Sequence, residues 1–375
     1  MAEQSCERVF APAYIWDFFC DGAACGSRCC GGWRIPVDAA SRERLETISE
    51  REEIFAHLEQ QDTGWATRHG ENGNCSFLDA DGLCLLQKKY GEEYLPDICY
   101  SYPRVSYRFT GFVERSLAMS CPVAARIALI SEIPMRFEER TVFVRRVSAS
   151  IHPPMEALAW ENAIRSIQIH SISFLQERAY PLRERFWRLG RFFEALESRC
   201  GRTSPDTATL DCCVADVEED AEPVVRAEPM LRLRYVASLL DAIYEAHYPP
   251  ERIEALAACV STVEADVEAD LHVRNGHILE NLAVNEFFLR LYPFACGGGF
   301  STNFKLFALR FRIAEFSLLL AAAAKNITLD EDRILEMLDR IMERLDHSRA
   351  SDEFLRRCAA EDFSGMTSGG FLALL

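Results

Sequence analysis

The stretch Cys20-Asp-Gly-Ala-Ala-Cys25-Gly-Ser-Arg-Cys29-Cys30-Gly-Gly-Trp33 places four cysteines close together near the start of the chain. A chain of 375 residues can bury a large hydrophobic core, so it does not need disulfide bonds to stabilise its fold. Thiolates at this density indicate a bound metal ion or an iron–sulfur cluster. The expected metal ligands are Cys20, Cys25, Cys29, Cys30, Cys75, Cys84, Cys99 and Cys121.

The residues around these cysteines favour a site made of thiolates alone. His57 and His69 are the only histidines in the first 150 residues, and neither has a finger-like spacing to a cysteine pair. An iron–sulfur cluster is therefore expected, with zinc as the alternative metal. Neighbouring side chains project in different directions, so Cys29 and Cys30 seldom ligate one ion together. Eight cysteines suffice for two four-thiolate sites or for one site with supporting thiols, and the sequence does not choose.

The net charge and the hydropathy of the chain limit the kinds of partner that it can bind. The formal net charge of −17 argues against nonspecific binding of nucleic acid or anionic membrane, and would attract a cationic, lysine-bearing surface. The most apolar run, 316–324, is too short to span a bilayer. No signal peptide is visible at the N-terminus, so we expect a cytoplasmic protein. In that reducing compartment a thiol array indicates metal binding or catalysis before disulfides.

The expected fold class is mainly α, with an irregular cysteine-rich metal-binding N-terminal module at 1–130 joined to a helical C-terminal region at 131–375. Within the module we expect a helix over 39–61 capped by Asp38 or Ser41, and a strand or hairpin over 105–113. A short helix should start near Ala118 and run through Leu129. Beyond it, helices are expected at 155–178, 182–200, 229–247, 250–272, 276–291, 301–324, 328–346 and 351–360, with a loop at 204–228. The phenylalanines Phe287, Phe288, Phe304, Phe307, Phe311 and Phe316 fit buried faces.

The spacing of the cysteines and of the residues beside them carries a family resemblance. The string Phe19 to Asp38 resembles the opening signature of the flagellin lysine-N-methylase (FliB) family. Three further blocks are similar to later blocks of that family, and 280–288 with Tyr292-Pro293 resembles a C-terminal one. The part from Cys25 to Arg104 also resembles small bacterial cysteine-cluster proteins that chelate zinc or iron. The three further blocks are Cys75 to Cys84, Gly91 to Arg104 and Arg115 to Arg126.

The resemblance implies methyl transfer from S-adenosylmethionine to lysine side chains of flagellin by a protein that carries an iron–sulfur cluster, expected as 4Fe-4S. Two common signatures are missing. No glycine-rich strand-to-helix loop of the Rossmann type stands out. The radical-enzyme spacing Cys-x3-Cys-x2-Cys is also absent, because Gly32 stands where the third cysteine would be needed.

If the protein is a methylase, Arg104 and Arg126 are candidates to form an ion pair with the carboxylate of the methyl donor. Trp33 or Tyr102 is a candidate to stack on its adenine or sulfonium. Simpler roles are open to the same residues: Arg104 can cap carbonyl groups, and Trp33 can exclude water. The attacking lysine must lose a proton, so a base is required, but the sequence assigns none. The catalytic residues are therefore left unknown.

Two other functions compete with the methylase. A non-enzymatic iron or zinc-binding protein would need only the cysteine block, so the long helical half counts against it. A redox sensor predicts an output element such as a helix-turn-helix, and the acidic chain shows no basic DNA-binding surface.

Overall fold

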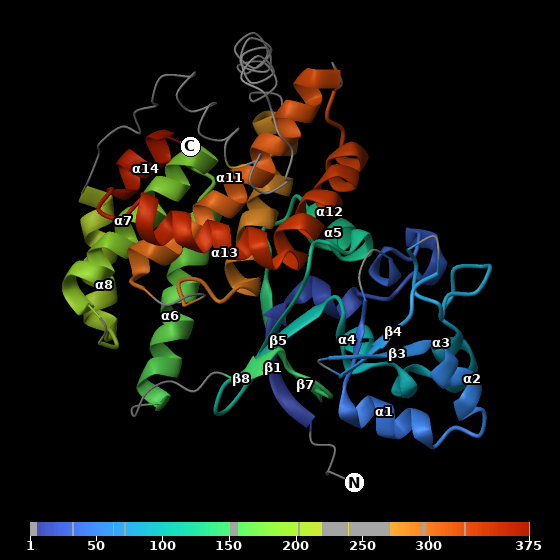
Figure 1. Ribbon diagram of the computed structural model, residues 1–375. Coiled ribbons are helices and arrows are strands. Elements are labelled where there is room, and N and C mark those ends of the chain that lie inside the picture. Colours follow the sequence, from blue (N-terminus) through green and yellow to red (C-terminus); the bar gives the residue numbers. More distant parts are fainter. Residues whose placement is uncertain are drawn as a thin grey trace.

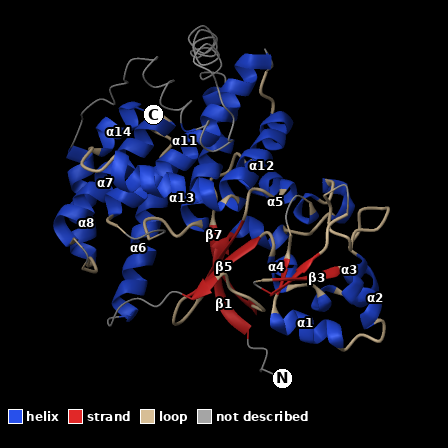
Figure 2. Ribbon diagram, in the orientation of Figure 1, coloured by secondary structure: helices blue, strands red, loops and turns tan. Residues whose placement is uncertain are grey.

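The computed structural model describes residues 6–31, 34–62, 64–70, 73–150, 157–201, 203–219, 239, 271–294, 298–325 and 328–374. Most of the described chain is helical, as expected, and a sheet lies between the helical region and the cysteine-rich part (Figures 1 and 2). No helix among these residues is long and apolar enough to cross a membrane.

The central sheet has five strands in the order β7-β1-β6-β5-β8. Strand β1 pairs antiparallel with β7 over its whole length and parallel with β6. The expected hairpin at 105–113 is confirmed as β5 and β6. The rest of the sheet was not expected, because β1 pairs with β6 and β7 more than a hundred residues away in sequence, and β8 pairs with β5 42 residues away. The strands are β1 (Cys6–Pro12), β5 (Arg104–Arg108), β6 (Val113–Leu117), β7 (Phe137–Phe143) and β8 (Ala149–Ser150).

The cysteine-rich part contains short regular elements rather than an irregular chain. The single helix expected over 39–61 is wrong: it divides into α1, α2 and β3, because Leu58–Gln61 pairs with β4 instead of continuing the helix. Asp38 is the N-cap of α1, as one of the two expected candidates. The strands β2 (Pro36–Val37), β3 (Leu58–Gln61) and β4 (Gly64–Thr67) form a second sheet. The helices are α1 (Ala39–Glu46), α2 (Arg51–Ala56), α3 (Leu85–Tyr90), α4 (Asp97–Ser101) and α5 (Pro122–Leu129), with 3-10 turns at Ala13–Asp17, Gly22–Cys25, Arg28–Cys30 and Glu92–Tyr94.

The C-terminal region is a packed set of helices. The expected loop at 204–228 is wrong for 207–219, where Leu210, Cys213 and Val217 bury one face of α8 against α7. The helices expected at 229–247 and over most of 250–272 lie outside the described residues. The helices are α6 (Ala157–Gln176), α7 (Leu182–Cys200), α8 (Thr207–Glu219), 271–289, α11 (Phe300–Lys325), α12 (Glu331–His347), α13 (Arg349–Arg357) and α14 (Ser368–Leu374), with a π-helical turn at Cys358–Asp362.

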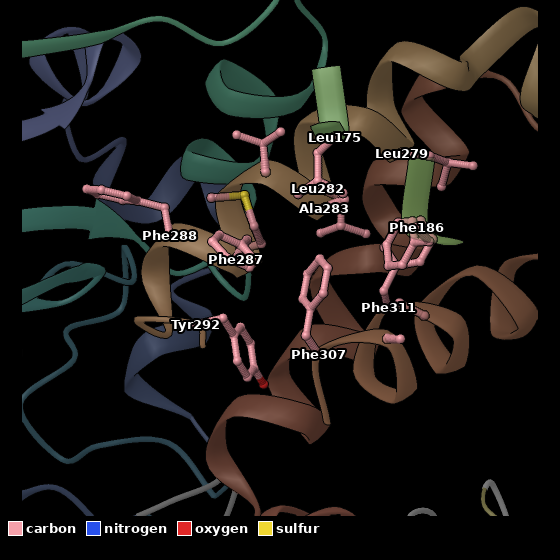
Figure 3. Packing of buried hydrophobic residues seen from close by; sticks show 14 of the residues in the cluster. Leu175, Phe186, Leu279, Leu282, Ala283, Phe287, Phe288, Tyr292, Phe307 and Phe311 are labelled. Carbon is pink, nitrogen blue, oxygen red and sulfur yellow. The ribbon is translucent and has the colours of Figure 1, made fainter. Parts of the chain in front are cut away.

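Buried phenylalanines form the centre of this helical core, as their spacing predicts. Phe307 of α11 stacks on Phe186 of α7 with ring centroids 5.1 Å apart, and meets Phe287 edge-on at 5.3 Å (Figure 3). All three side chains are at most 1% exposed. Offset-stacked and edge-to-face pairs of this kind add to the free energy gained by burial. The aromatic residues are therefore core and not part of a cofactor site.

Gly190 of α7 tests how tightly this core is packed. A Cβ atom at Gly190 would lie 2.5 Å from the Ser368 Cβ and 2.7 Å from the Phe304 ring. Gly190→Ala should therefore lower the free energy of unfolding by about 1–3 kcal/mol in urea denaturation. Gly276→Ala is the matched control, since open space surrounds Gly276 in its helix and alanine should stabilise it by roughly 0.5–1 kcal/mol. Equal effects of the two substitutions would contradict the packing.

Glu114 gives the central sheet a pH-dependent stability. Its carboxylate is 1% exposed and accepts a hydrogen bond from Gln168 Nε2 at 3.1 Å. Burial raises the pKa of Glu114 to about 7, with Gln168 and Arg165 opposing the shift. The folded state thus holds this proton more tightly than the unfolded chain does. The free energy of unfolding contributed by Glu114 therefore falls as pH rises from about 4.5 to about 7.

Glu114→Gln should remove this loss, because glutamine stays neutral and can still accept from Gln168. Relative to the original chain, the variant should gain roughly 1.4 kcal/mol of unfolding free energy per pH unit across that window, and no more above it. Denaturation curves between pH 5 and 8 measure the gain. Glu138→Gln, at a partly exposed position of β7, should leave the pH profile unchanged. Parallel profiles for E114Q and the original chain would rule out the assignment.

Candidate functional site

All eight cysteines of the N-terminal set line one cavity of about 430 Å³. They come from separate segments, and several stand at helix ends. Cys25 ends one 3-10 turn, Cys29 and Cys30 lie in the next, and Cys84 and Cys121 are the N-caps of α3 and α5. The cavity also has apolar walls, formed by Phe18, Phe77, Leu86 and Leu95. The eight cysteines that the sequence groups together therefore lie together in the fold.

Backbone hydrogen bonds tie the cysteine segments to one another. The Cys75 amide donates to the Cys30 carbonyl at 2.7 Å, and Gly31 forms an isolated bridge with Asn74. Ser27 Oγ donates to the Gly82 carbonyl at 2.6 Å, joining the first cysteine loop to the turn before Cys84. These bonds hold the loops in place with little regular secondary structure.

Asp38 anchors the helix that carries Cys99. Asp38 Oδ1 accepts from the Ser41 amide at 2.8 Å as the N-cap of α1, and its Oδ2 accepts from the Asp97 amide at 3.1 Å. One carboxylate therefore caps two helices, α1 and α4. This contact holds the first turn of α4, two residues before Cys99.

The thiols differ in how readily they ionise. Burial raises the pKa of Cys99 well above its ordinary value, and raises that of Cys121 to about 11. The Cys29 and Cys30 sulfurs lie 3.8 Å apart, and a hydrogen bond from Cys30 lowers the pKa of Cys29 to about 7 while raising that of Cys30. A bound cation would hold such thiols as thiolates, because metal coordination deprotonates them.

The donor set consists of thiols, which suit an iron–sulfur cluster or a zinc ion. In the described part of the chain, no group of three or more histidine, cysteine, aspartate or glutamate side chains is arranged to hold a metal ion. The metal-binding module expected from the sequence thus stays a prediction. The cavity nevertheless gathers eight sulfur donors in an apolar enclosure, and iron–sulfur clusters use four cysteine thiolates each. The residues present fit such a cluster.

The three candidate cofactor-binding residues have different positions. Arg104 lines the cysteine cavity, and its guanidinium lies over the Phe18 ring at 5.0 Å. Arg126 lies in the last turn of α5 and forms an ion pair with Asp332 at 2.7 Å instead of lining the cavity. Trp33 falls outside the described residues. Tyr102, the alternative to Trp33 for stacking, also lines the cavity, so Arg104 and Tyr102 are the candidates that the structure brings to the cysteines.

Sequence reasoning missed the residues of α12 that lie beside this cavity. Arg28 forms ion pairs with Asp339 at 2.5 Å and with Glu343 at 3.1 Å. His347, at the end of the same helix, contacts Ser120 next to Cys121. The position of Arg28 inside the cysteine loop was visible in the sequence, but nothing there connects it to residues more than 300 positions away.

The fold and site define a mainly helical protein with a small sheet and a cavity lined by clustered cysteines. Residues 168–375 match the FliB lysine N-methylase C-terminal domain, more than half of the chain. The chain therefore belongs to the FliB lysine N-methylase family, which confirms the resemblance found in the sequence.

Two relatives are lysine-N-methylases, from Salmonella choleraesuis (strain SC-B67) and Salmonella typhimurium (strain LT2). Each is 30% identical over 159 residues, which is 40% of this chain and 40% of the relative. The flagellar biosynthetic protein FliU of Salmonella muenchen is 31% identical over 145 residues, 36% of this chain and 86% of that protein. The matches thus span well under half of the two lysine-N-methylases. No solved structure matches the chain.

Asp38→Ala tests the double cap. The substitution should lower the free energy of unfolding by about 1–2 kcal/mol and speed alkylation of Cys99 by iodoacetamide, because α4 loses an anchor. Urea denaturation and mass-spectrometric mapping of the modified cysteine measure the two effects. Asp330→Ala is the control, since Asp330 caps α12 in the same way, accepting from Arg333 at 2.9 Å. It should cost similar stability without exposing Cys99, so equal alkylation rates in the two variants would contradict the proposed anchor.

Proposed function

We propose that this protein transfers methyl groups from S-adenosylmethionine to lysine side chains of flagellin, and that its cysteine cavity holds a 4Fe-4S cluster. The observation that carries the proposal is the gathering of eight thiols round one cavity in a chain of the FliB lysine N-methylase family. The names of the relatives, lysine-N-methylase and flagellar biosynthetic protein, support a lysine substrate in the flagellum. A reducing cytoplasmic setting belongs to the proposal, since thiolate ligands must stay reduced.

The ligands of the cluster would come from Cys20, Cys25, Cys29, Cys30, Cys75, Cys84, Cys99 and Cys121. When bound, such a cluster can offer an iron that coordinates the amino and carboxylate groups of a methionine moiety. The chain supplies the surroundings. Phe77 and Leu86 are at most 2% exposed and keep water from the cavity wall.

Arg104 is the residue best placed to orient the methyl donor. It lines the cysteine cavity and also an adjoining cavity of about 310 Å³. Among the described residues no carboxylate lies within ion-pair distance of Arg104, whereas Arg126 is paired with Asp332. A guanidinium without an ion-pair partner can donate to the carboxylate oxygen that the iron would leave free. We therefore assign Arg104 to the carboxylate of S-adenosylmethionine and leave Arg126 with a structural role.

Anaerobic purification followed by iron, sulfide and zinc analysis tests the cluster. We expect iron and sulfide in the purified protein, and roughly tenfold or greater loss of iron affinity in Cys75→Ser and Cys99→Ser, because each removes a thiolate from the cavity. Cys212→Ser is the control, since Cys212 is exposed on α8 and far from the set in sequence. A colourless protein with stoichiometric zinc and no iron would overturn the cluster.

A methylation assay distinguishes an enzyme from a non-enzymatic metal-binding protein. The iron-loaded protein is incubated with S-adenosylmethionine and flagellin, and the masses of flagellin lysines are measured. Addition of methyl groups to lysine supports the proposal. Unchanged lysine masses with the metal bound would favour the alternative, a non-enzymatic iron or zinc-binding cysteine-cluster protein.

A further inference from the structure

A groove of about 730 Å³ lies between the cysteine-rich part and α12. Its walls include residues of both halves of the chain. Three of them, Arg28, Cys29 and Tyr102, also line the cysteine cavity, so the two spaces meet at these side chains. On the other side, the groove is bounded by the last turns of α12 up to His347. A side chain entering the groove would therefore reach the border of the cysteine cavity.

A chain of hydrogen bonds runs from that border to the protein surface. The Tyr102 hydroxyl and Ser120 Oγ lie 3.2 Å apart, and Ser120 Oγ lies 3.1 Å from His347 Nε2. Ser120 is buried at 5% exposure, Tyr102 is partly buried and His347 is exposed. The order of the three groups thus follows a path from the cavity to solvent.

The end of α12 is fixed by buried charges, which holds His347 in this path. Arg310 is at most 2% exposed; it donates to the Leu345 carbonyl at 3.0 Å and to Asp346 Oδ1 at 2.8 Å. Arg290 also pairs with Asp346. Because Asp346 precedes His347 directly, these contacts set the position of the imidazole.

We propose that this groove receives the target lysine and that Tyr102, Ser120 and His347 carry its proton away. This inference rests on the proposed function and deepens it, since it assigns the entry of the substrate and the missing base. Methylation requires a neutral amine, because an ammonium group has no lone pair to attack with.

The proton transfer balances as a relay. The lysine ammonium gives one proton to the Tyr102 hydroxyl oxygen, Tyr102 passes its own proton to Ser120, and Ser120 passes its proton to Nε2 of a neutral His347. Tyr102 and Ser120 end neutral, the substrate ends as an amine, and the imidazolium releases its proton to water once flagellin leaves the groove.

Among the described residues, the groove wall holds three arginines, Arg28, Arg340 and Arg344, and one carboxylate, Glu343. Arg28 is neutralised by Asp339 and Glu343, and the Glu343 side chain is 46% exposed at the groove. Arg344 is exposed on α12 and can meet acidic residues that flank the target lysine. Arg340 is paired with Glu336 at 3.1 Å, so two of the three arginines at the groove already have counter-charges.

Protection of His347 from diethyl pyrocarbonate tests the groove without relying on catalysis. Saturating flagellin should slow carbethoxylation of His347 at least about fivefold, mapped by mass spectrometry, because flagellin bound along the groove would block access of the reagent to the imidazole. His272, 27% exposed and outside the groove walls, should react equally with and without flagellin. Unchanged reactivity of His347 would overturn the inference whether or not flagellin is methylated. Protection without methylation would support the groove and count against the proposed function.

Kinetics of the methylating protein test the relay. His347→Gln, Ser120→Ala and Tyr102→Phe should each lower kcat by about 10²- to 10⁴-fold with little change in KM and unchanged iron content. Added imidazole should restore part of the kcat of His347→Gly, which a merely structural role would not allow. Arg349→Trp, on α13 and outside the groove, is a control for folding. Relay variants that keep the original kcat would overturn the assignment of the base.

Discussion

The ion pairs of Arg28 hold the cysteine-rich part against the C-terminal helices. Its guanidinium reaches Asp339 and Glu343 on α12, 311 and 315 positions away in the chain. Asp339 is 3% exposed, so loss of Arg28 would leave a buried carboxylate without its counter-charge, which is strongly destabilising. Cys29 follows Arg28 directly, and the same contact therefore fixes the paired thiols beside α12. The cavity and the groove both border this contact.

The cavity contains buried thiols whose ionisation a bound metal would favour. Burial raises the pKa of Cys99 and Cys121, which disfavours their thiolates. The proposed metal cluster would supply the positive charge that reverses this preference. Backbone hydrogen bonds between the short segments hold the thiols close together. One example is the bond from the Cys75 amide to the Cys30 carbonyl. The family membership and this donor set together support the proposed iron–sulfur methylase.

Some of the fold followed from local pattern. The β5–β6 hairpin, α7 and the phenylalanine faces around Phe307 have periodicity that short-range sequence displays. The central sheet did not, because the seven residues of β1 form a strand through their pairing with β7 far along the chain. The helix expected over 39–61 failed for the same reason, since β4 recruits Leu58–Gln61. α8 was missed because its short apolar face lies within a polar, turn-rich stretch.

The sequence alone identified the eight cysteines as one set and indicated the family to which the chain belongs. Both rest on the spacing of residues along the chain, which can be read without the fold. Only the tertiary structure decided what surrounds the set. It kept Arg104 at the cavity, placed Arg126 in an ion pair with Asp332, and brought His347 within hydrogen-bond distance of Ser120. Contacts across more than 200 residues depend on how helices and sheet pack, and no local pattern encodes that packing.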